Sequence, residues 1–250
     1  MIQFYTIPPQ LYDDQFWWKT NDIYFWKQVL FSSTATSNIL EIASGTGRLA
    51  QPLIVEGAKY SGLEISQEYA DFSILKLSQY IENPSIYIGD MRNFNLNQTF
   101  DYVFIGFNSL LHLLNEEDLN QFLKNVKNHM HAKSIFYIDV LIPKNDFLYR
   151  DTEKLKIMSF KDTVADCELD IYERLKYNSF TEIADILWTY YKKSKKKYSF
   201  NFQMKMFYPD TLNKALVDNG FYIESLWGDY DGSAISEKSD LQIYKCLLRD

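Results

Sequence analysis

Cysteine and histidine are scarce in this chain of 250 residues, which limits the metal and redox chemistry that it can carry out. The two cysteines, Cys167 and Cys246, lie far apart and have no partners at metal-ligand spacing, so we expect two buried thiols. The three histidines include no pair at the H-E-x-x-H spacing of a zinc-binding helix. No metal site is predicted.

Positive charge is also in deficit, with 26 Lys and Arg residues against 33 Asp and Glu residues and a net charge of −7 at pH 7. This balance repels polyphosphate backbones, so we expect no nucleic-acid partner. The chain has no apolar run of 18 residues, and its start, MIQFYTIPPQ, lacks the basic and apolar segments of a secretory signal. We therefore expect a cytoplasmic protein with no membrane segment.

Aromatic residues, in contrast, are abundant, with 19 Tyr, 18 Phe and 5 Trp in the chain. Together with the other apolar residues they can build a sizeable core. Their number is equally compatible with an aromatic-lined pocket for a small molecule, so the composition leaves both interpretations open.

Between residues 38 and 142, apolar runs of strand length alternate with segments of helical period, a pattern typical of a parallel sheet wound with helices. We expect five such strands, at residues 38–43, 59–65, 85–90, 100–107 and 134–142. A helix is expected to begin at Asn115, with its apolar face formed by Leu119, Phe122, Leu123, Val126 and Met130. Pro52 is expected to kink or shorten the helix after the first strand.

The rest of the chain suggests one compact domain with an inserted lobe. Residues 150–208 are rich in β-forming residues and are expected to form an antiparallel lobe over the active site, with the lysine run 192–197 in a solvated hairpin turn. A helix from Pro209, with Leu212, Leu216 and Val217 on its apolar face, precedes two strands at 221–228 and 241–248 that close the sheet as an antiparallel hairpin. Residues 1–37 are expected to form a helical lid, and residues 38–149 and 209–250 the core. The predicted fold is α/β, doubly wound and Rossmann-like.

The stretch LEIASGTGR, residues 40–48, follows the first strand and has the outline of a nucleotide-binding turn. Gly45 and Gly47 permit positive φ and a close approach of backbone N–H groups to a ligand. Taken alone, these glycines with Ala50 and Glu64 also fit a dinucleotide-binding turn. The turn by itself therefore leaves the cofactor open.

Three further features favour a cationic, adenine-containing ligand. Glu41 stands near the end of the first strand, where a carboxylate suits a positive group, and Asp90 with Met91 ends the third strand with an acceptor and a soft apolar surface. More than thirty residues precede the first strand, enough for a lid. Each acid also has a plainer interpretation, Glu41 as a solvated strand-end residue and Asp90 as a turn residue.

With these residues in order, the sequence resembles the class I S-adenosylmethionine-dependent methyltransferases. LEIASGTGR resembles the family's first motif, acid-x-Gly-x-Gly-x-Gly, with an alanine at the first glycine position, and FDYVFIGFNSLLHL, residues 100–113, resembles the motif that borders the transferred methyl group. The tail from residue 204, including GDYDGS at 228–233, is similar to that of small-molecule enzymes such as amino-sugar and glycine-type N-methyltransferases. A methyl group at Ala43 is tolerable there if φ is negative.

The resemblance implies S-adenosylmethionine as cofactor and a set of residues that bind it. These are Tyr12, Glu41, Ala43, Gly45, Gly47, Arg48, Glu64, Ile65, Asp90, Met91, Phe107 and Asn108. For catalysis, His112 is a candidate base and Tyr12 a candidate residue over the cofactor, although a helix-start histidine and plain lid packing explain them as well. Asp229 and Asp231 could face an amine, but a tight loop uses the same residues.

The predicted function is direct, in-line methyl transfer to a small molecule, with an amine favoured over a hydroxyl by the similarity of the tail. The acceptor is expected to be the main partner, and the protein a monomer or homodimer. Two alternatives stay open: a nicotinamide-dependent oxidoreductase, and a binding protein that keeps the cofactor pocket without catalysis.

Overall fold

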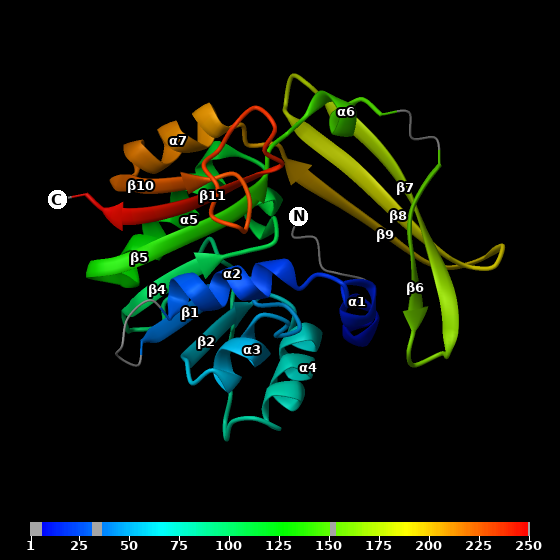
Figure 1. Cartoon of the computed structure of the whole chain (residues 1–250), viewed down its shortest axis with the longest axis horizontal. Helices are drawn as coiled ribbons and strands as arrows, with labels where there is room; N and C mark the ends of the chain where they lie inside the picture. The colour runs from blue at the N-terminus through cyan, green and yellow to red at the C-terminus, as the bar shows by residue number, and fades with distance from the viewer. Residues whose placement is uncertain (1–6, 32–36, 151–153, 250) are drawn as a thin grey trace. The chain divides into compact units, whose positions relative to one another are not determined.

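The computed structural model describes residues 7–31, 37–150 and 154–249, which fall into two compact units (Figure 1). The larger unit consists of residues 20–142 and 207–250, and the smaller one of residues 1–19 and 143–206. The chain thus passes from the smaller unit into the larger one and later returns to each of them.

The larger unit is built on a seven-stranded sheet with the order β10-β11-β5-β4-β1-β2-β3. Its strands are β1 (Asn38–Ile42), β2 (Lys59–Glu64), β3 (Ser85–Ile88), β4 (Phe100–Ile105), β5 (Met130–Leu141), β10 (Phe221–Trp227) and β11 (Leu241–Leu248). The first five strands pair in parallel, while β11 is antiparallel to both β5 and β10. The sheet is therefore parallel with an antiparallel hairpin at one edge.

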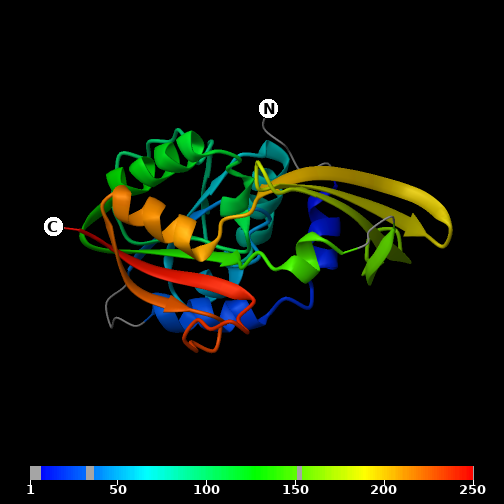
Figure 2. The same ribbon diagram turned by 90° about the horizontal axis from the view of Figure 1, so that it is seen from above.

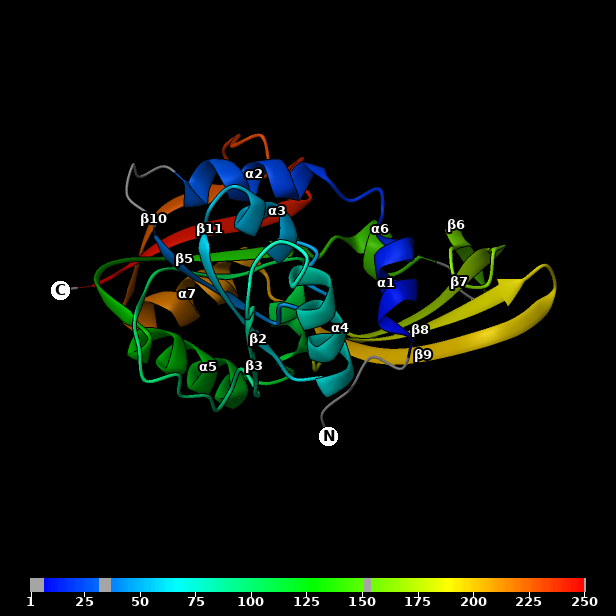
Figure 3. The ribbon, with the colours of Figure 1, turned by 90° about the horizontal axis from the view of Figure 1, so that it is seen from below.

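Helices cover both faces of this sheet. They are α2 (Asn21–Leu30), α3 (Ala50–Val55), α4 (Gln67–Leu77), the 3₁₀ helix η1 (Ser109–His112), α5 (Glu116–Asn128) and α7 (Pro209–Asp218). Figures 2 and 3 show α2 on one face and α5 with α7 on the other. No helix of the described residues is long and apolar enough to cross a bilayer.

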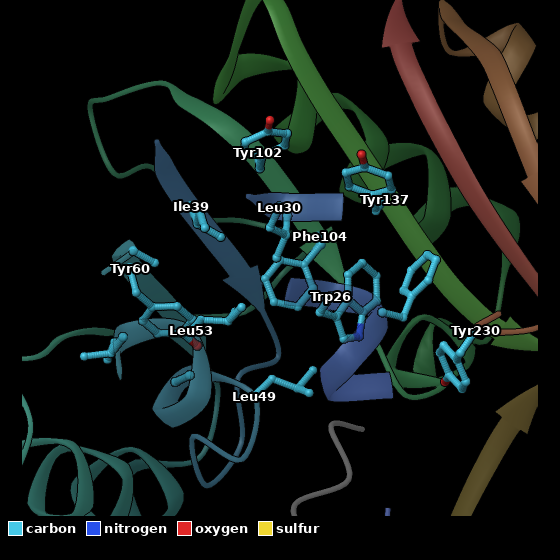
Figure 4. Close-up of a cluster of buried hydrophobic side chains, with 14 of the residues drawn as sticks. Trp26, Leu30, Ile39, Leu49, Leu53, Tyr60, Tyr102, Phe104, Tyr137 and Tyr230 are labelled. Carbon is cyan, nitrogen blue, oxygen red and sulfur yellow. The ribbon is translucent and has the colours of Figure 1, made fainter. Parts of the chain in front are cut away.

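The core between α2 and the sheet is centred on Trp26, which is fully buried (Figure 4). Its ring lies 4.7 Å from that of Phe104 on β4 and 6.0 Å from that of Tyr137 on β5, centroid to centroid. Phe104 and Tyr137 are register partners, so their side chains share one sheet face. Burial of these large rings, at about 25 cal/mol per Å² of apolar surface, anchors α2 to the sheet.

The opposite face of the sheet receives α5 and α7. The Asn115 side chain caps α5 by accepting a hydrogen bond from the Asp118 N–H at 2.8 Å, and acidic residues occupy the first turn of the helix. The Phe122 ring of α5 lies 6.1 Å from that of Phe136, which neighbours Phe221 at 5.5 Å. This aromatic row joins α5, β5 and β10.

The smaller unit is a four-stranded antiparallel sheet with the order β6-β7-β8-β9. It contains α1 (Pro9–Gln15), α6 (Asn145–Leu148), β6 (Leu155–Asp162), β7 (Cys167–Asn178), β8 (Ile183–Lys192) and β9 (Lys195–Lys205). The Asp14 carboxylate of α1 accepts hydrogen bonds from the Thr163 backbone N–H at 2.8 Å and from its hydroxyl at 2.9 Å. The Tyr190 hydroxyl donates to the Gln15 side chain at 2.7 Å, so α1 is fastened to the β6–β9 sheet.

The predicted fold class is confirmed, and every strand predicted for the larger unit is present. The inserted segment is antiparallel, and the lysine run forms the exposed turn of the β8–β9 hairpin. Helix α3, which contains Pro52, has only six residues. One strand, β6, was not predicted, because half of its residues are exposed and its apolar alternation is weak.

Three residues differ from their predicted surroundings. Met130 begins β5 instead of continuing α5, because the helix ends before His129, whose ring binds the Asn125 carbonyl and the Leu96 N–H. Val217 is exposed, since it lies about 100° around α7 from the buried Leu216. Cys167 is only partly buried at the start of β7, whereas Cys246 is buried as expected.

The residues predicted as a single lid belong to two units. Residues 7–19 belong with the β6–β9 sheet, whereas α2 belongs with the seven-stranded sheet and packs on its face. The predicted boundaries of the core, at residues 38 and 209, also differ from those of the larger unit, which includes residues 20–142 and 207–250. A covering role for the lid and for the lobe stays a prediction.

Candidate functional site

The order of the parallel strands reverses at β1, which lies between β2 and β4. In open α/β sheets a ligand binds beyond the carboxyl ends of the strands at such a reversal. Here the turn after β1, residues 43–49, and the turn after β4, residues 106–108, leave adjacent parallel strands at the same edge. The elements of the larger unit therefore bring together the motif at residues 40–48 and the motif at residues 100–113.

The turn after β1 uses left-handed backbone conformations at three positions. The φ values are +56° at Gly45, +73° at Gly47 and +59° at Ala43. A negative φ at Ala43 was the condition under which its methyl group would be tolerated, and the structure does not meet that condition: the alanine has a left-handed φ, which favours glycine.

The two glycines have different surroundings. A Cβ added to Gly45 would meet no heavy atom within 4 Å, so the backbone at this position faces open space that a ligand can approach. A Cβ added to Gly47 would lie 2.6 Å from the Ser73 Oγ on α4, so Gly47 is needed for close packing of the turn on α4. The turn thus has one glycine open to a ligand and one required by the fold.

Glu64, the last residue of β2, is buried beside this turn and fastened to it. Its carboxylate accepts a hydrogen bond from the Gly45 N–H at 2.8 Å and another from the Ser66 N–H at 2.8 Å. Burial raises the pKa of Glu64, and the backbone hydrogen bonds oppose that rise. Each carboxylate oxygen keeps a lone pair for a further donor, as recognition of ribose hydroxyls requires.

Glu41 of β1 is also buried, and it has a partner that the sequence did not indicate. The Tyr60 hydroxyl of β2 donates a hydrogen bond to its carboxylate at 2.5 Å. Burial raises the pKa of Glu41 to about 8, and the Tyr60 hydrogen bond and the Arg48 charge only partly offset this effect. Glu41 is therefore not a solvated strand-end acid but a buried carboxyl group that a nearby cation would stabilise in its charged form.

Arg48, predicted to contact the cofactor, is held by other side chains of the larger unit. Its guanidinium donates two hydrogen bonds to the fully buried Asp22 of α2, at 3.0 Å and 2.6 Å. It also lies over the Phe107 ring, 5.0 Å from its centroid. Arg48 thus connects α2 and the turn after β1 to the turn after β4.

The charge balance of this region favours a cation. Four carboxyl groups are buried in the larger unit at or near the carboxyl edge of the sheet: Asp22, Glu41, Glu64 and Asp139. Arg48 pairs with Asp22, and the pKa of Glu41 nevertheless stays far above its ordinary range. A ligand with a positive group fits this excess of acid, and an anionic dinucleotide fits it poorly.

Asp90 and Met91 follow β3, as predicted, and Ile65 follows β2; Met91 and Ile65 are half-buried. Asp90 belongs to a tight turn in which Arg92 pairs with its carboxylate at 2.6 Å and with Asp118 at 3.2 Å. Burial acts to raise the pKa of Asp90, but the hydrogen bonds and charge of Arg92 outweigh it and lower the pKa. The structure therefore shows the turn role of Asp90, and its adenine-binding role stays a prediction.

Phe107 and Asn108 both have left-handed backbone conformations, with φ of +52° and +64°. The Phe107 N–H donates to the Asp139 carboxylate at 3.1 Å, and the Asn108 side chain accepts from the Leu141 N–H at 2.7 Å. Asp139, buried on β5, also accepts from the Tyr230 hydroxyl at 2.6 Å. Sequence reasoning missed both Asp139 and Tyr230, although Tyr230 lies within the GDYDGS segment that carried part of the resemblance.

The candidate base His112 ends the 3₁₀ helix η1 after β4 and is half-buried. His129 has a structural role, since its ring stacks on Phe94 at 4.4 Å and binds two backbone groups. Asp229 and Asp231 accept hydrogen bonds from the N–H groups of Tyr230 and Ser233, so both shape the loop. Within the described residues, no three His, Cys, Asp or Glu side chains are arranged to hold a metal ion.

Tyr12 lies on α1 in the smaller unit, where its ring contacts Phe16 at 4.8 Å. It is the one predicted site residue outside the larger unit. Its role over a cofactor stays a prediction.

Comparison with known proteins identifies the domain. Residues 39–133 match the family described as "Methyltransferase domain". A curated protein of Saccharopolyspora spinosa, dTDP-4-amino-2,3,4,6-tetradeoxy-D-glucose N,N-dimethyltransferase, is 26% identical over 102 residues. This match spans 41% of the chain and only 39% of the relative's length.

Solved structures extend the likeness to nearly the whole chain. A S-adenosylmethionine-dependent methyltransferase from Clostridium acetobutylicum superposes with a TM-score of 0.78 at 18% identity, covering 96% of this chain and 97% of its own. The sugar N-methyltransferase KedS8 from a Streptoalloteichus species gives 0.73 at 16% identity, covering 96% and 93%. Residues 39–133 therefore form a methyltransferase domain in a chain with the fold of S-adenosylmethionine-dependent methyltransferases, which confirms the resemblance seen in the sequence.

Proposed function

We propose that this protein is a S-adenosylmethionine-dependent methyltransferase that methylates an amine of a small molecule. The observation that carries the proposal is the pair of buried carboxyl groups, Glu41 and Glu64, near the open, left-handed Gly45 in the part of the chain that matches a methyltransferase domain. When bound, the cofactor supplies an electrophilic methyl group on a sulfonium and a positively charged methionine amine.

The residues of the larger unit fit such a ligand. Gly45 leaves room for close approach, Glu64 has acceptor capacity beside it, and Glu41 lacks a full counter-charge. We assign Glu41 to the cationic part of the cofactor, Glu64 to the ribose, and Asp90 with Met91 and Ile65 to the adenine. Phe107 and Asn108, with Arg48 beside them, border the methyl group in this assignment.

The chain needs to supply little covalent chemistry. Alignment of the acceptor and exclusion of water account for much of the catalysis of an in-line transfer, and an accepting amine has to be neutral. In this proposal His112 accepts the proton of the amine, and Tyr12 lies over the cofactor. Both roles rest on the position of these residues in the chain.

The acceptor that we propose is an amino sugar. The curated relative is named for a dTDP-linked 4-amino sugar, and KedS8 is a sugar N-methyltransferase. We further propose that the protein is cytoplasmic, binds no nucleic acid, and is a monomer or homodimer. Light scattering and a filter-binding assay with duplex DNA test the last two points.

Calorimetry with S-adenosylhomocysteine tests the cofactor site. Glu64→Ala is expected to weaken binding by at least about a hundredfold, because a buried acceptor and its two backbone contacts are lost. Glu68→Ala, an exposed acid on the neighbouring helix α4, is the control and should bind as the native protein does. No binding by the native protein would contradict the proposal.

Incubation with S-adenosylmethionine and a panel of amines and alcohols, followed by mass spectrometry, tests the reaction. A mass gain of one methyl group on a dTDP-linked 4-amino sugar is the expected result. Cofactor binding without any methylated product would favour a non-catalytic protein, and enhanced NADH fluorescence on mixing would favour an oxidoreductase.

A further inference from the structure

The loop between β10 and β11, residues 228–240, places a buried tyrosine against the strand that borders the candidate site. Tyr230 packs against the Phe25 ring of α2 at 5.7 Å and donates its hydroxyl to Asp139 at 2.6 Å. Burial and the adjacent carboxylate both raise the pKa of Tyr230, so the hydroxyl stays protonated and acts as a donor.

Asp139 uses the same carboxylate oxygen to hold the turn after β4. Its Oδ2 accepts from the Phe107 N–H at 3.1 Å as well as from Tyr230. The backbone carbonyl of Asp139 accepts from the Asn108 N–H at 3.1 Å. Because Oδ2 receives both donors, the position of the tyrosine hydroxyl restricts the position of the Phe107 N–H.

The turn needs such support because it is strained. Two consecutive residues other than glycine adopt left-handed conformations, at a cost that persists only where the surroundings impose it, and such residues concentrate at functional sites. The hydrogen bond from Leu141 to the Asn108 side chain supplies a second restraint. The turn is thus held by residues of β5, and Tyr230 supports one of them, Asp139, through a hydrogen bond.

The contacts continue to the glycine-rich turn. The Phe107 ring lies under the Arg48 guanidinium, which pairs with Asp22 of α2. We infer that Tyr230 is a positioning residue that acts through Asp139 to keep the Phe107–Asn108 turn, and with it Arg48, in the geometry that the cofactor site requires. This inference rests on the proposed function only for the identity of the ligand.

A matched pair of variants tests the inference. Tyr230→Phe removes the hydroxyl that contacts Asp139, and Tyr244→Phe removes the hydroxyl of another buried tyrosine in the same unit, which donates to Gln242 at 2.8 Å. Amide hydrogen exchange of Phe107 and Asn108, measured by NMR on the ligand-free protein, should become about tenfold faster in Tyr230→Phe. S-adenosylhomocysteine should bind that variant about tenfold more weakly, while Tyr244→Phe matches the native protein in both measurements.

A double mutant separates positioning from simple loss of stability. Asp139→Asn should produce similar changes, and adding Tyr230→Phe to it should change the exchange of Phe107 by less than about threefold, because the route through the carboxylate is already broken. Four results would each overturn the inference. Two concern the single variants: unchanged exchange in Tyr230→Phe, or equal effects of the two tyrosine variants. The other two are additive effects of Tyr230→Phe and Asp139→Asn, and faster exchange with unchanged ligand affinity. Failure of the native protein to bind S-adenosylhomocysteine would instead refute the proposed function, and exchange on the ligand-free protein would still decide whether Tyr230 positions the turn.

Discussion

Ala43 has a φ of +59°, in a region where a side chain brings Cβ close to the following carbonyl group. The cost is about 1–2 kcal/mol for an L-residue other than glycine. The neighbouring glycines have the same sign of φ, so the left-handed conformation belongs to the turn and not to the residue. Ala43 therefore adopts the left-handed backbone conformation of the turn in spite of its energetic cost.

Ala43→Gly is therefore expected to raise the free energy of unfolding by up to about 1 kcal/mol, after the greater freedom of glycine in the unfolded chain is subtracted. Denaturant titration measures the change. Ala70→Gly, the same substitution inside α4, is the control and should lower the free energy of unfolding by about 1 kcal/mol. Destabilisation by both substitutions would show that the strain at Ala43 is absent.

Glu41 links ligand binding to pH. Its pKa is raised to about 8 by burial, so the ligand-free protein binds a proton there at neutral pH. A cationic ligand favours the carboxylate and lowers that pKa, so binding releases the proton. The affinity should rise with pH up to about 8 and become constant above it.

Calorimetry with S-adenosylhomocysteine between pH 6 and 8.5 measures this effect, with an upper limit of about tenfold per pH unit for one proton. Glu41→Gln should bind weakly and lose the pH dependence. Tyr60→Phe removes a hydrogen bond that lowers the pKa of Glu41, so its affinity should become constant only at a higher pH. A pH-independent affinity in the native protein would exclude Glu41 as the residue that meets the positive group.

At the scale of the elements, the turn after β1 and helix α4 fit together through Gly47. Its φ of +73° and the 2.6 Å between a Cβ at this position and the Ser73 Oγ are two separate obstacles to any larger residue. Gly57 has a φ of +99°, but no heavy atom lies within 4 Å of such a Cβ. A larger residue at Gly57 would therefore meet backbone strain but no steric clash.

Gly47→Ala should therefore destabilise the protein by about 3 kcal/mol, and Gly57→Ala by only about 1–2 kcal/mol. Adding Ser73→Gly to Gly47→Ala should remove the clash and restore part of the difference, in spite of the cost of a glycine inside α4. Thermal unfolding of the variants provides the comparison. Equal losses in the two single variants would show that packing on α4 does not constrain the turn.

Helix α1, part of the predicted lid, belongs to the same unit as the β6–β9 sheet. Asp14 and Gln15 fasten α1 to Thr163 and Tyr190, so Tyr12 belongs to the same unit as the β6–β9 sheet. In that unit the buried Glu173 pairs with Arg150 and accepts from the Trp188 indole N–H at 2.9 Å. A change in the position of this sheet would therefore carry Tyr12 with it.

At the scale of the whole molecule, the two units should respond to different ligands. S-adenosylhomocysteine is expected to slow amide exchange in residues 37–67 and 100–112 of the larger unit, where the predicted cofactor residues lie. If the β6–β9 sheet covers the active site, addition of a dTDP-linked 4-amino sugar should slow exchange in β7–β9 as well.

Hydrogen exchange followed by mass spectrometry measures both effects in one experiment. The nucleoside diphosphate dTDP without the sugar is the control for the acceptor, since it lacks the amine. An amino sugar that is methylated without any change of exchange in residues 167–205 would refute the covering role of the lobe.

Local pattern was sufficient to predict much of this protein. The apolar runs and turn residues gave the seven strands of the main sheet, the start of α5 at Asn115 and the antiparallel insertion, because strand and helix periods depend on neighbours in the sequence. The order of Glu41, Gly45, Gly47 and Glu64 at strand ends was likewise visible, since the carboxyl ends of parallel strands share one edge.

The tertiary structure decided how those residues are held. Asp22 and Arg48 are 26 positions apart, Asp139 and Tyr230 are 91 apart, and Asp14 and Thr163 are 149 apart, so no local period reveals these pairs. The raised pKa of Glu41 likewise follows from burial, which the hydrogen bond from Tyr60 on the neighbouring strand offsets only in part. The sequence by itself determined the class of fold and the residues at the carboxyl edge of the parallel strands, because these depend on short-range pattern. Only the folded chain decided the charge, strain and partners of those residues, because burial and pairing arise from contacts between segments distant in the sequence.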